Sequence, residues 1–174
     1  MLTIGDKFPK FKKPSVLANK EFGDITSDDH KKEGKWMVIF WYPKDFTFIC
    51  PTEIIEFNNQ HDKFVELSAV LYGASTDTED VHLAWRENDR TLNDLKFPLI
   101  ADTSKSLSKK LGILQPSKVA YRATFIVDPD GIIQWININN DNTGRNIAEV
   151  LRALEATQNV EKTPCNWVPG QATL

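Results

Sequence analysis

The sequence has 174 residues, of which 41% are hydrophobic and 26% are charged, and its formal net charge is −3 at pH 7. A chain of this length suits one domain that buries about 70% of its unfolded surface, and the slightly acidic balance argues against a nucleic-acid partner. Residues 1–14 lack the apolar segment of a signal peptide, and no apolar run reaches the roughly 20 residues that cross a bilayer. We therefore expect a cytoplasmic protein with no nucleic-acid or membrane partner.

Residues 1–30 are expected to form an N-terminal extension with a small hairpin. The first strong structural pattern comes after them. Residues 36–42 (WMVIFWY) are a continuous apolar run of aromatic and β-branched side chains, the pattern of a strand buried on both faces. After Pro43 a spacing of three and four residues predicts a helix. The side chains with this spacing are Ile54, Phe57, His61 and Phe64.

Strands and helices alternate through the middle of the chain. Residues 69–74 predict a strand, and the polar stretch 75–80 supplies candidate N-caps for a helix that runs through Trp85. A short strand at 97–101 and a helix near 104–111 follow.

The last third of the chain predicts an antiparallel hairpin and a helix. Strands at 121–127 and 132–138 flank the turn 128–131 (DPDG), and the final helix begins near Thr143. This succession indicates an α/β fold with a mixed central sheet flanked by helices, in the order of a thioredoxin-like core.

Cys50 and Cys165 are the only cysteines. In a secreted protein they would suggest a structural bridge, whereas in a reducing cytoplasm they favour a transient catalytic disulfide. His30, His61 and His82 are scattered without metal-ligand spacing, so we expect no metal site. His61 and His82 fall in helix patterns and are expected to serve packing or to lie at the surface.

Cys50 stands where the first buried strand gives way to the first long helix. Pro51 suits a first helical turn, and the N–H groups and dipole of a helix start favour a thiolate over a thiol. The Thr47 hydroxyl can donate to the sulfur or to an incoming peroxide oxygen, and Pro43 can shield the sulfur from water. The alternative is that Cys50 is a small buried hydrophobic residue in a loop of turn formers.

Arg122 lies near the start of the otherwise apolar stretch 119–127. A guanidinium in such a strand is costly unless an anion pairs with it, and the start of this strand can face the helix that begins near Cys50. A thiolate or a charged peroxide oxygen would be a suitable partner. The alternative is a salt bridge at a sheet edge.

Residues 46–53 (FTFICPTE), preceded by 40–45 (FWYPKD), resemble the peroxidatic motif of the typical 2-Cys peroxiredoxins, and most closely the bacterial alkyl hydroperoxide reductase (AhpC) type. The similarity continues through 97–98 (FP), 122–129 (RATFIVDP), 144–146 (GRN) and 164–167 (PCNW). It therefore covers nearly the whole chain, and implies a thioredoxin-like peroxiredoxin domain over 1–159 and a C-terminal tail over 160–174.

The resemblance implies a role for each matching residue at the first cysteine. Cys50 would be the peroxidatic cysteine, which attacks the peroxide and becomes a sulfenic acid. Thr47 and Arg122 would activate both the thiolate and the peroxide, and Pro43 would shield the sulfur.

The resemblance also implies partners. Glu53 and Arg145 would form a supporting polar network, and Cys165 would be the resolving cysteine, supplied by the other subunit of a homodimer. The family also assembles dimers into rings. Hydrogen peroxide and organic hydroperoxides would be substrates without any cofactor, and an AhpF-type flavoprotein, an AhpD-type protein or thioredoxin would be the dithiol reductant.

Two other functions remain open from the sequence. A thioredoxin-type disulfide-exchange protein would share the fold but normally carries Cys-x-x-Cys, whereas residues 47–50 read TFIC, with a hydroxyl in place of the first thiol. A non-enzymatic holdase activity is a further alternative. The aromatic side chains of 40–48 could line a pocket for an organic peroxide, but we expect core and subunit contacts.

The sequence further predicts resistance to inactivation by excess peroxide. Peroxide-sensitive relatives carry a Gly-Gly-Leu-Gly insertion and a C-terminal helix with Tyr-Phe. Here residues 86–95 read RENDRTLNDL, and nine residues follow Cys165.

Overall fold

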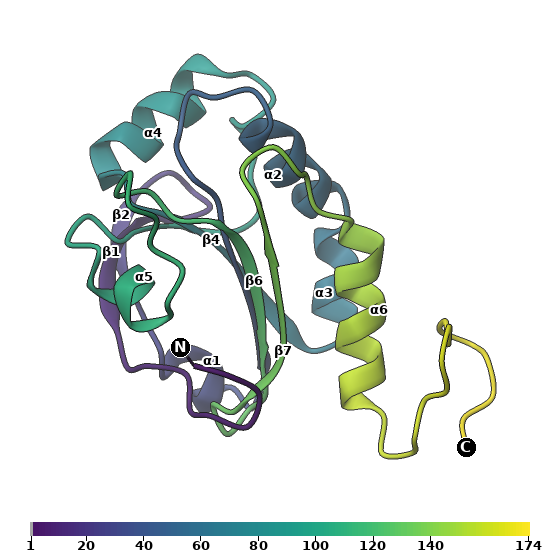
Figure 1. The fold of residues 1–174 in the computed structure, drawn as a ribbon. Helices are drawn as coiled ribbons and strands as arrows, with labels where there is room; N and C mark the ends of the chain where they lie inside the picture. Colours follow the sequence, from purple (N-terminus) through teal and green to yellow (C-terminus); the bar gives the residue numbers. More distant parts are fainter. Residues whose placement is uncertain (1) are drawn as a thin grey trace.

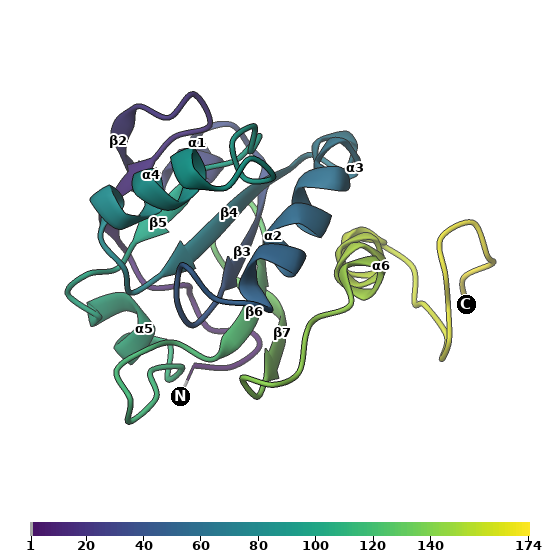
Figure 2. The ribbon, with the colours of Figure 1, turned by 90° about the horizontal axis from the view of Figure 1, so that it is seen from above.

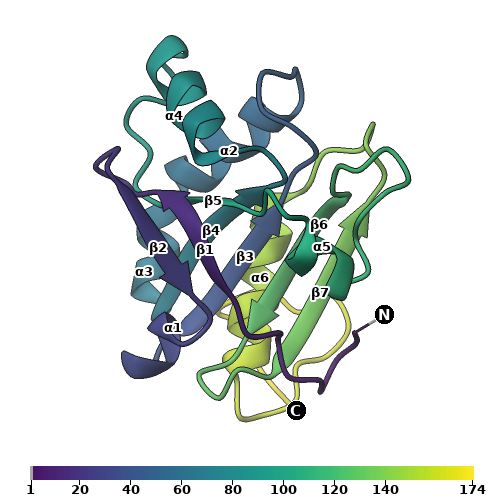
Figure 3. The ribbon, with the colours of Figure 1, turned by 90° about the vertical axis from the view of Figure 1, so that its left-hand side faces the viewer.

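Seven strands form one mixed sheet in the computed structural model, which describes residues 2–174 (Figure 1). In spatial order they are β2 (Phe22–Thr26), β1 (Lys12–Val16), β5 (Leu99–Ala101), β4 (Ala69–Ser75), β3 (Trp36–Trp41), β6 (Arg122–Val127) and β7 (Ile133–Asn139). β3, β4 and β5 are parallel, and the other neighbours are antiparallel, as Figure 3 shows across the sheet. The predicted mixed sheet and the final hairpin are confirmed.

The N-terminal extension is a hairpin, as predicted, and it also enlarges the sheet. β1 pairs with β2 and, on its other edge, with β5, where Val16 lies opposite Leu99. Of the predicted extension over 1–30, residue 1 lies outside the described residues. The hairpin covers the β5 edge, so it protects one side of the parallel core from further strand pairing.

Helices cover both faces of the sheet (Figures 1 and 2). They are α1 (Asp29–Lys32), α2 (Cys50–Asn59), α3 (His61–Glu66), α4 (Glu79–Asn88), α5 (Ser106–Lys110) and α6 (Ile147–Gln158). The single helix predicted after Pro43 is in fact two, because the backbone leaves helical geometry at Gln60. α6 starts three residues after Gly144 because the Asn146 side chain caps it, accepting from the Glu149 N–H at 3.2 Å.

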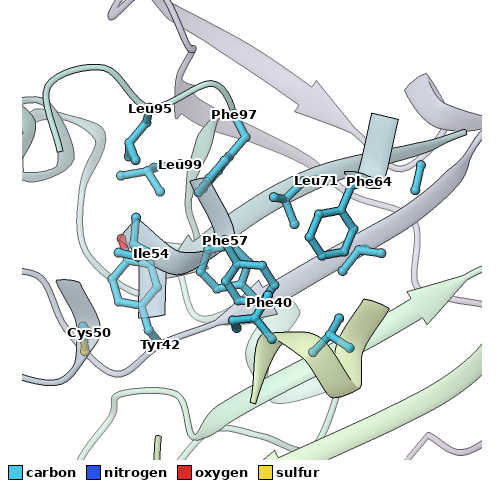
Figure 4. Packing of buried hydrophobic residues seen from close by; sticks show 14 of the residues in the cluster. Phe40, Tyr42, Cys50, Ile54, Phe57, Phe64, Leu71, Leu95, Phe97 and Leu99 are labelled. Carbon is cyan, nitrogen blue, oxygen red and sulfur yellow. The ribbon is translucent and has the colours of Figure 1, made fainter. Parts of the chain in front are cut away.

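The central strand β3 divides the core into two layers. Val38, Phe40 and the following Tyr42 pack in the cluster beneath α2, α3, α4 and α6, whereas Met37 and Ile39 pack on the α5 side. Figure 4 shows the first cluster, with Phe40 stacked on Phe57 at a centroid distance of 4.0 Å. β3 is therefore buried on both faces, which the unbroken apolar run predicted.

The same sheet end brings together three chain segments. β3 ends at Trp41, α2 begins at Cys50, and β6 begins at Arg122. Because β6 runs antiparallel to β3, with Thr124 opposite Phe40, the first residue of β6 lies where β3 finishes. In the described residues, no helix is long and apolar enough to cross a membrane.

The C-terminal segment after α6 projects from the body of the molecule and folds back on itself (Figures 1 and 2). The Leu174 N–H donates to the Lys162 carbonyl at 2.8 Å, which closes a loop over residues 162–174. Trp167 is only 3% exposed inside this loop, and its carbonyl accepts from Arg152 of α6 at 3.3 Å.

Candidate active site

Cys50 is the first residue of α2, as the sequence predicted, and Pro51 lies at the start of the helix. The Cys50 side chain is fully buried, at the margin of the aromatic cluster in Figure 4. The N–H groups and dipole of the helix start favour negative charge on its sulfur. The sulfur therefore lies at a helix N-terminus and out of contact with solvent.

Arg122 supplies the positive charge at this sulfur. Its Nη1 group donates to Cys50 Sγ at 3.4 Å and to Glu53 Oε2 at 2.9 Å, and its Nε donates to the Asp141 carbonyl at 2.8 Å. Burial would lower the pKa of Arg122, but the hydrogen bonds and charges of Cys50 and Glu53 raise it. The guanidinium is 4% exposed, so it is an internal partner of the thiol and not a salt bridge at a sheet edge.

Glu53 and Arg145 form the network behind Arg122 that the resemblance implied. Glu53 accepts from the Arg145 backbone N–H at 2.8 Å and from its Nε and Nη2 groups at 3.2 and 2.8 Å. Burial alone would raise the pKa of Glu53, but the charge and hydrogen bonds of Arg145, with the charge of Arg122, lower it. Glu53 is thus a buried carboxylate that holds both guanidinium groups.

The Thr47 hydroxyl is directed differently from the sequence-based expectation. It donates to the Lys44 carbonyl at 2.9 Å, so its proton is committed to the loop and not to the Cys50 sulfur. The hydroxyl oxygen still has lone pairs that can accept from a protonated peroxide oxygen. Pro43 is buried in the loop between β3 and α2, where shielding of the sulfur remains a proposal.

Cys165 is an exposed thiol in the projecting C-terminal segment, whereas Cys50 is buried, and neither is bonded to the other. An exposed thiol cannot reach a fully buried sulfur, so a bond between them requires α2 to open at its start. The structure therefore shows the site in the reduced, closed arrangement.

A second buried polar group next to the site was not predicted. Asp45 accepts from the Tyr42 hydroxyl at 2.7 Å, and its other carboxylate oxygen lies 2.6 Å from His82 Nδ1. His82, which the sequence predicts to serve packing or to lie at the surface, has a fully buried side chain. The only sign of this buried group in the sequence was an acidic residue, Asp45, that lies among the aromatic residues Tyr42 and Phe46.

A buried thiol at a helix start, paired with an internal guanidinium on a thioredoxin-like sheet, defines a thiol-based redox enzyme. Residues 4–136 match the AhpC/TSA family. A putative peroxiredoxin, YkuU, from Bacillus subtilis is 44% identical over 175 residues, covering 98% of this chain and 97% of the relative. Alkyl hydroperoxide reductase C from Mycobacterium tuberculosis is 43% identical over 185 residues, covering 100% and 94%.

Solved structures give the same result. Reduced 2-Cys peroxiredoxin from Plasmodium vivax superposes with a TM-score of 0.94 at 32% identity, covering 99% of this chain and 93% of that one. AhpC from Mycobacterium bovis gives 0.88 at 41% identity, covering 96% and 98%. The chain belongs to the AhpC/TSA family, and it is a thiol-dependent peroxidase of the peroxiredoxin class.

Proposed function

We propose that this protein reduces hydrogen peroxide and organic hydroperoxides, with Cys50 as the attacking thiol and Cys165 as the resolving thiol. The observation that carries the proposal is the 3.4 Å contact between Arg122 Nη1 and the buried Cys50 sulfur at the start of α2. The names of the similar proteins, peroxiredoxin and alkyl hydroperoxide reductase, support the same substrate class. Peroxide consumption by the reduced protein, with and without Cys50, is the test.

In the first step the Cys50 thiolate attacks the terminal peroxide oxygen. The S–O bond forms as the O–O bond breaks, the terminal OH passes to the sulfur as a sulfenic acid, and the leaving alkoxide or hydroxide takes a proton from solvent to become alcohol or water. Negative charge develops on the leaving oxygen, where Arg122 and the Cys50 backbone N–H stabilise it. The Thr47 hydroxyl oxygen, open to accept a hydrogen bond, orients the peroxide. No metal, flavin or haem takes part in this step.

In the second step the Cys165 thiol condenses with the sulfenic acid, forming the disulfide and releasing water. Because Cys50 is fully buried, residues at the start of α2 must unwind first. This requirement is consistent with the bonds there, which are short-range: Thr52 Oγ1 and N both donate to the Ile49 carbonyl, at 2.6 and 3.1 Å. A dithiol protein then supplies two electrons to reduce the disulfide.

The exposed edge of β7 supports a homodimer. β7 ends the sheet, and at Ile133 its outer edge is bonded to the backbone of Gly5 and Asp6; beyond Ile133 no strand of the described residues pairs with this edge, and Ile138 on it is 39% exposed. Pairing of β7 with the same strand of a second copy would satisfy this edge with twofold symmetry. Since the C-terminal segment projects from α6, which packs beside β7, such a dimer would offer Cys165 to the partner.

Oxidation of the wild-type protein with one equivalent of peroxide is expected to give disulfides between chains. Non-reducing gels should then show a dimer band that collapses to monomer on reduction, and Cys165→Ser should abolish the band. An internal Cys50–Cys165 bond in a monomer, identified by mass spectrometry, would contradict the proposed partner contribution.

The reductant is a dithiol protein, which an AhpF-type flavoprotein, an AhpD-type protein or thioredoxin could supply. A reducing cytoplasm, the compartment we propose, keeps such partners available. The proposed division of the chain is a catalytic domain over 1–159 and a tail over 160–174 that carries the resolving thiol, and rings of dimers are the proposed larger assembly. Turnover reconstituted with each reductant in turn identifies the partner.

The enzyme is expected to resist over-oxidation by excess peroxide. The loop after α4 lacks the glycine motif of sensitive relatives, and Phe48 beside the helix start is 95% exposed, so little covers the segment that must open. Rapid opening lets Cys165 meet the sulfenic acid before a second peroxide does. Intact mass during turnover should show mostly disulfide. Gain of two oxygens on Cys50 at low peroxide, with Cys165 still reduced, would show that opening is slow.

A further inference from the structure

A fully buried polar group fastens the entrance of the loop that carries Thr47. It consists of Tyr42, Asp45 and His82, each at most 1% exposed, and is called the anchor below. Asp45 accepts from the Tyr42 hydroxyl at 2.7 Å and lies 2.6 Å from His82 Nδ1, and His82 Nε2 lies 3.0 Å from the Ile100 carbonyl.

The geometry of the anchor fixes its protons. The Ile100 carbonyl can only accept, so His82 Nε2 carries a hydrogen, and the 2.6 Å contact of Nδ1 with the Asp45 carboxyl group holds one further proton. Burial would lower the pKa of His82, but the hydrogen bond and charge of Asp45 raise it, and burial raises the pKa of Asp45. The anchor is therefore a proton-sharing pair of His82 and Asp45, joined by a short buried hydrogen bond.

The anchor attaches the loop entrance to α4 and the segment before it. The Asp45 N–H donates to Asp77 Oδ2 at 2.9 Å, and the Asp45 carboxylate is held by His82 of α4. The Phe46 ring, whose backbone has φ 56°, lies 6.0 Å from the Trp85 ring of the same helix. Residues 45 and 46 are thus held by three side chains, those of Asp77, His82 and Trp85.

A second fixed point lies at Glu53, which Arg145 and Arg122 hold through four hydrogen bonds. Between the two fixed points lie the six residues 47–52. Apart from the contact of Cys50 with Arg122, the hydrogen bonds that hold this segment are local turns. Phe48 at its tip is 95% exposed.

We propose that the anchor sets the limit of the unwinding that exposes Cys50, confining it to residues 47–52, and that His82 is a positioning residue of the catalytic cycle. This inference rests on the proposed function, because it concerns the opening that lets Cys165 reach the sulfenic acid. With the anchor intact, Thr47 and Cys50 return to their places beside Arg122 on each closure. Without it the open segment is longer, the closed arrangement is less populated, and attack on peroxide becomes slower while disulfide formation becomes faster.

The test uses two substitutions of His82 of similar size. His82→Gln places an amide near the position of Nε2, so it keeps the link to Ile100 and loses the link to Asp45. His82→Asn places an amide near Nδ1 and keeps a donor for Asp45. His30→Gln is the matched control, since His30 is also buried but its Nδ1 donates to the Lys35 carbonyl, in α1 on a different part of the sheet.

Hydrogen exchange of the reduced proteins measures the opening without any peroxide. In His82→Gln the peptide covering 47–53 is expected to exchange about tenfold faster or more, the change given by loss of one hydrogen bond that leaves a buried partner unsatisfied. His82→Asn and His30→Gln should stay near wild type in this peptide. Unchanged exchange in His82→Gln, or the same acceleration throughout the protein or in His30→Gln, would overturn the inference.

Stopped-flow fluorescence separates the two chemical steps, with tryptophans such as Trp85 beside the loop as reporters. His82→Gln should slow the peroxide-dependent phase and accelerate the peroxide-independent phase, and His82→Asn should restore both. If the wild type shows no peroxide-dependent phase, the proposed function fails, and the exchange measurement still decides the role of the anchor. If His82→Gln does not fold, Tyr42→Phe removes one bond to Asp45 and should shift exchange and both phases the same way, by about fivefold.

Discussion

Replacing Cys50 by serine is expected to reduce peroxide consumption to the uncatalysed background, whereas Cys165→Ser should leave the first oxidation intact. The hydroxyl of serine fits the buried site but is a far weaker nucleophile at neutral pH than a thiolate. Cys165 is exposed in the C-terminal segment and does not contact Cys50, so its removal stops only the formation of the disulfide. Stopped-flow measurement of a single turnover distinguishes the two steps.

Neither the Cys50→Ser variant nor the Cys165→Ser variant is expected to disturb the fold, so each serves as a folding control for the other. Both variants keep the bonds of Glu53 with Arg145 and Arg122, which hold the site without the sulfur. Far-ultraviolet circular dichroism and the thermal midpoint should therefore change little. Comparable single-turnover rates for wild type and Cys50→Ser would refute the assignment of the nucleophile.

The strands from residue 36 onward, and their succession along the chain, could be predicted because each depends on a short-range pattern. The apolar run at 36–42 and the turn at 128–131 lie within single segments, and both predictions are confirmed. The break at Gln60 could not be predicted, because Ile54, Phe57 and Phe64 continue the helical spacing across it. Both α2 and α3 pack against the same core, so the burial pattern does not reveal the break.

The site could be predicted in its components and not in its detailed contacts. Residue types at a strand-to-helix junction indicated Cys50, and an arginine in an apolar strand indicated an anion nearby; the structure places Arg122 Nη1 at 3.4 Å from the Cys50 sulfur and at 2.9 Å from the Glu53 carboxylate. The direction of the Thr47 hydroxyl depends on the turn of the loop, in which Phe46 takes a positive φ. The spacing of residues in the sequence does not predict this backbone conformation.

The anchor is a long-range feature and was missed for that reason. Asp45 and His82 are 37 residues apart, and the contact exists only because β4 brings α4 alongside the end of β3. A histidine on a predicted helix is usually a packing or surface residue, so His82 gave no separate signal. Burial of this hydrogen-bonded pair is a property of the fold, and only the folded chain shows it.

Arg122→Met is expected to slow attack on peroxide by about one to two orders of magnitude, since charge-assisted hydrogen bonds contribute about 1.5–3 kcal/mol. Methionine fills similar space but provides no donor to Cys50, so the thiolate and the charge on the leaving oxygen lose their stabilisation. Glu53 keeps its bonds to Arg145, so the variant does not leave a buried carboxylate unpaired. Titration of the ultraviolet absorbance of the thiolate and single-turnover kinetics measure the two effects.

Arg122→Lys separates charge from geometry. Lysine keeps the positive charge but lacks the fork that reaches Cys50, Glu53 and the Asp141 carbonyl together, so we expect a rate between those of methionine and wild type. A lysine variant as slow as the methionine variant would mean that the placement of the donor matters more than its charge. If Arg122→Met changes neither the thiolate titration nor the rate, Arg122 only holds β6 to α2 and another group must stabilise the leaving oxygen.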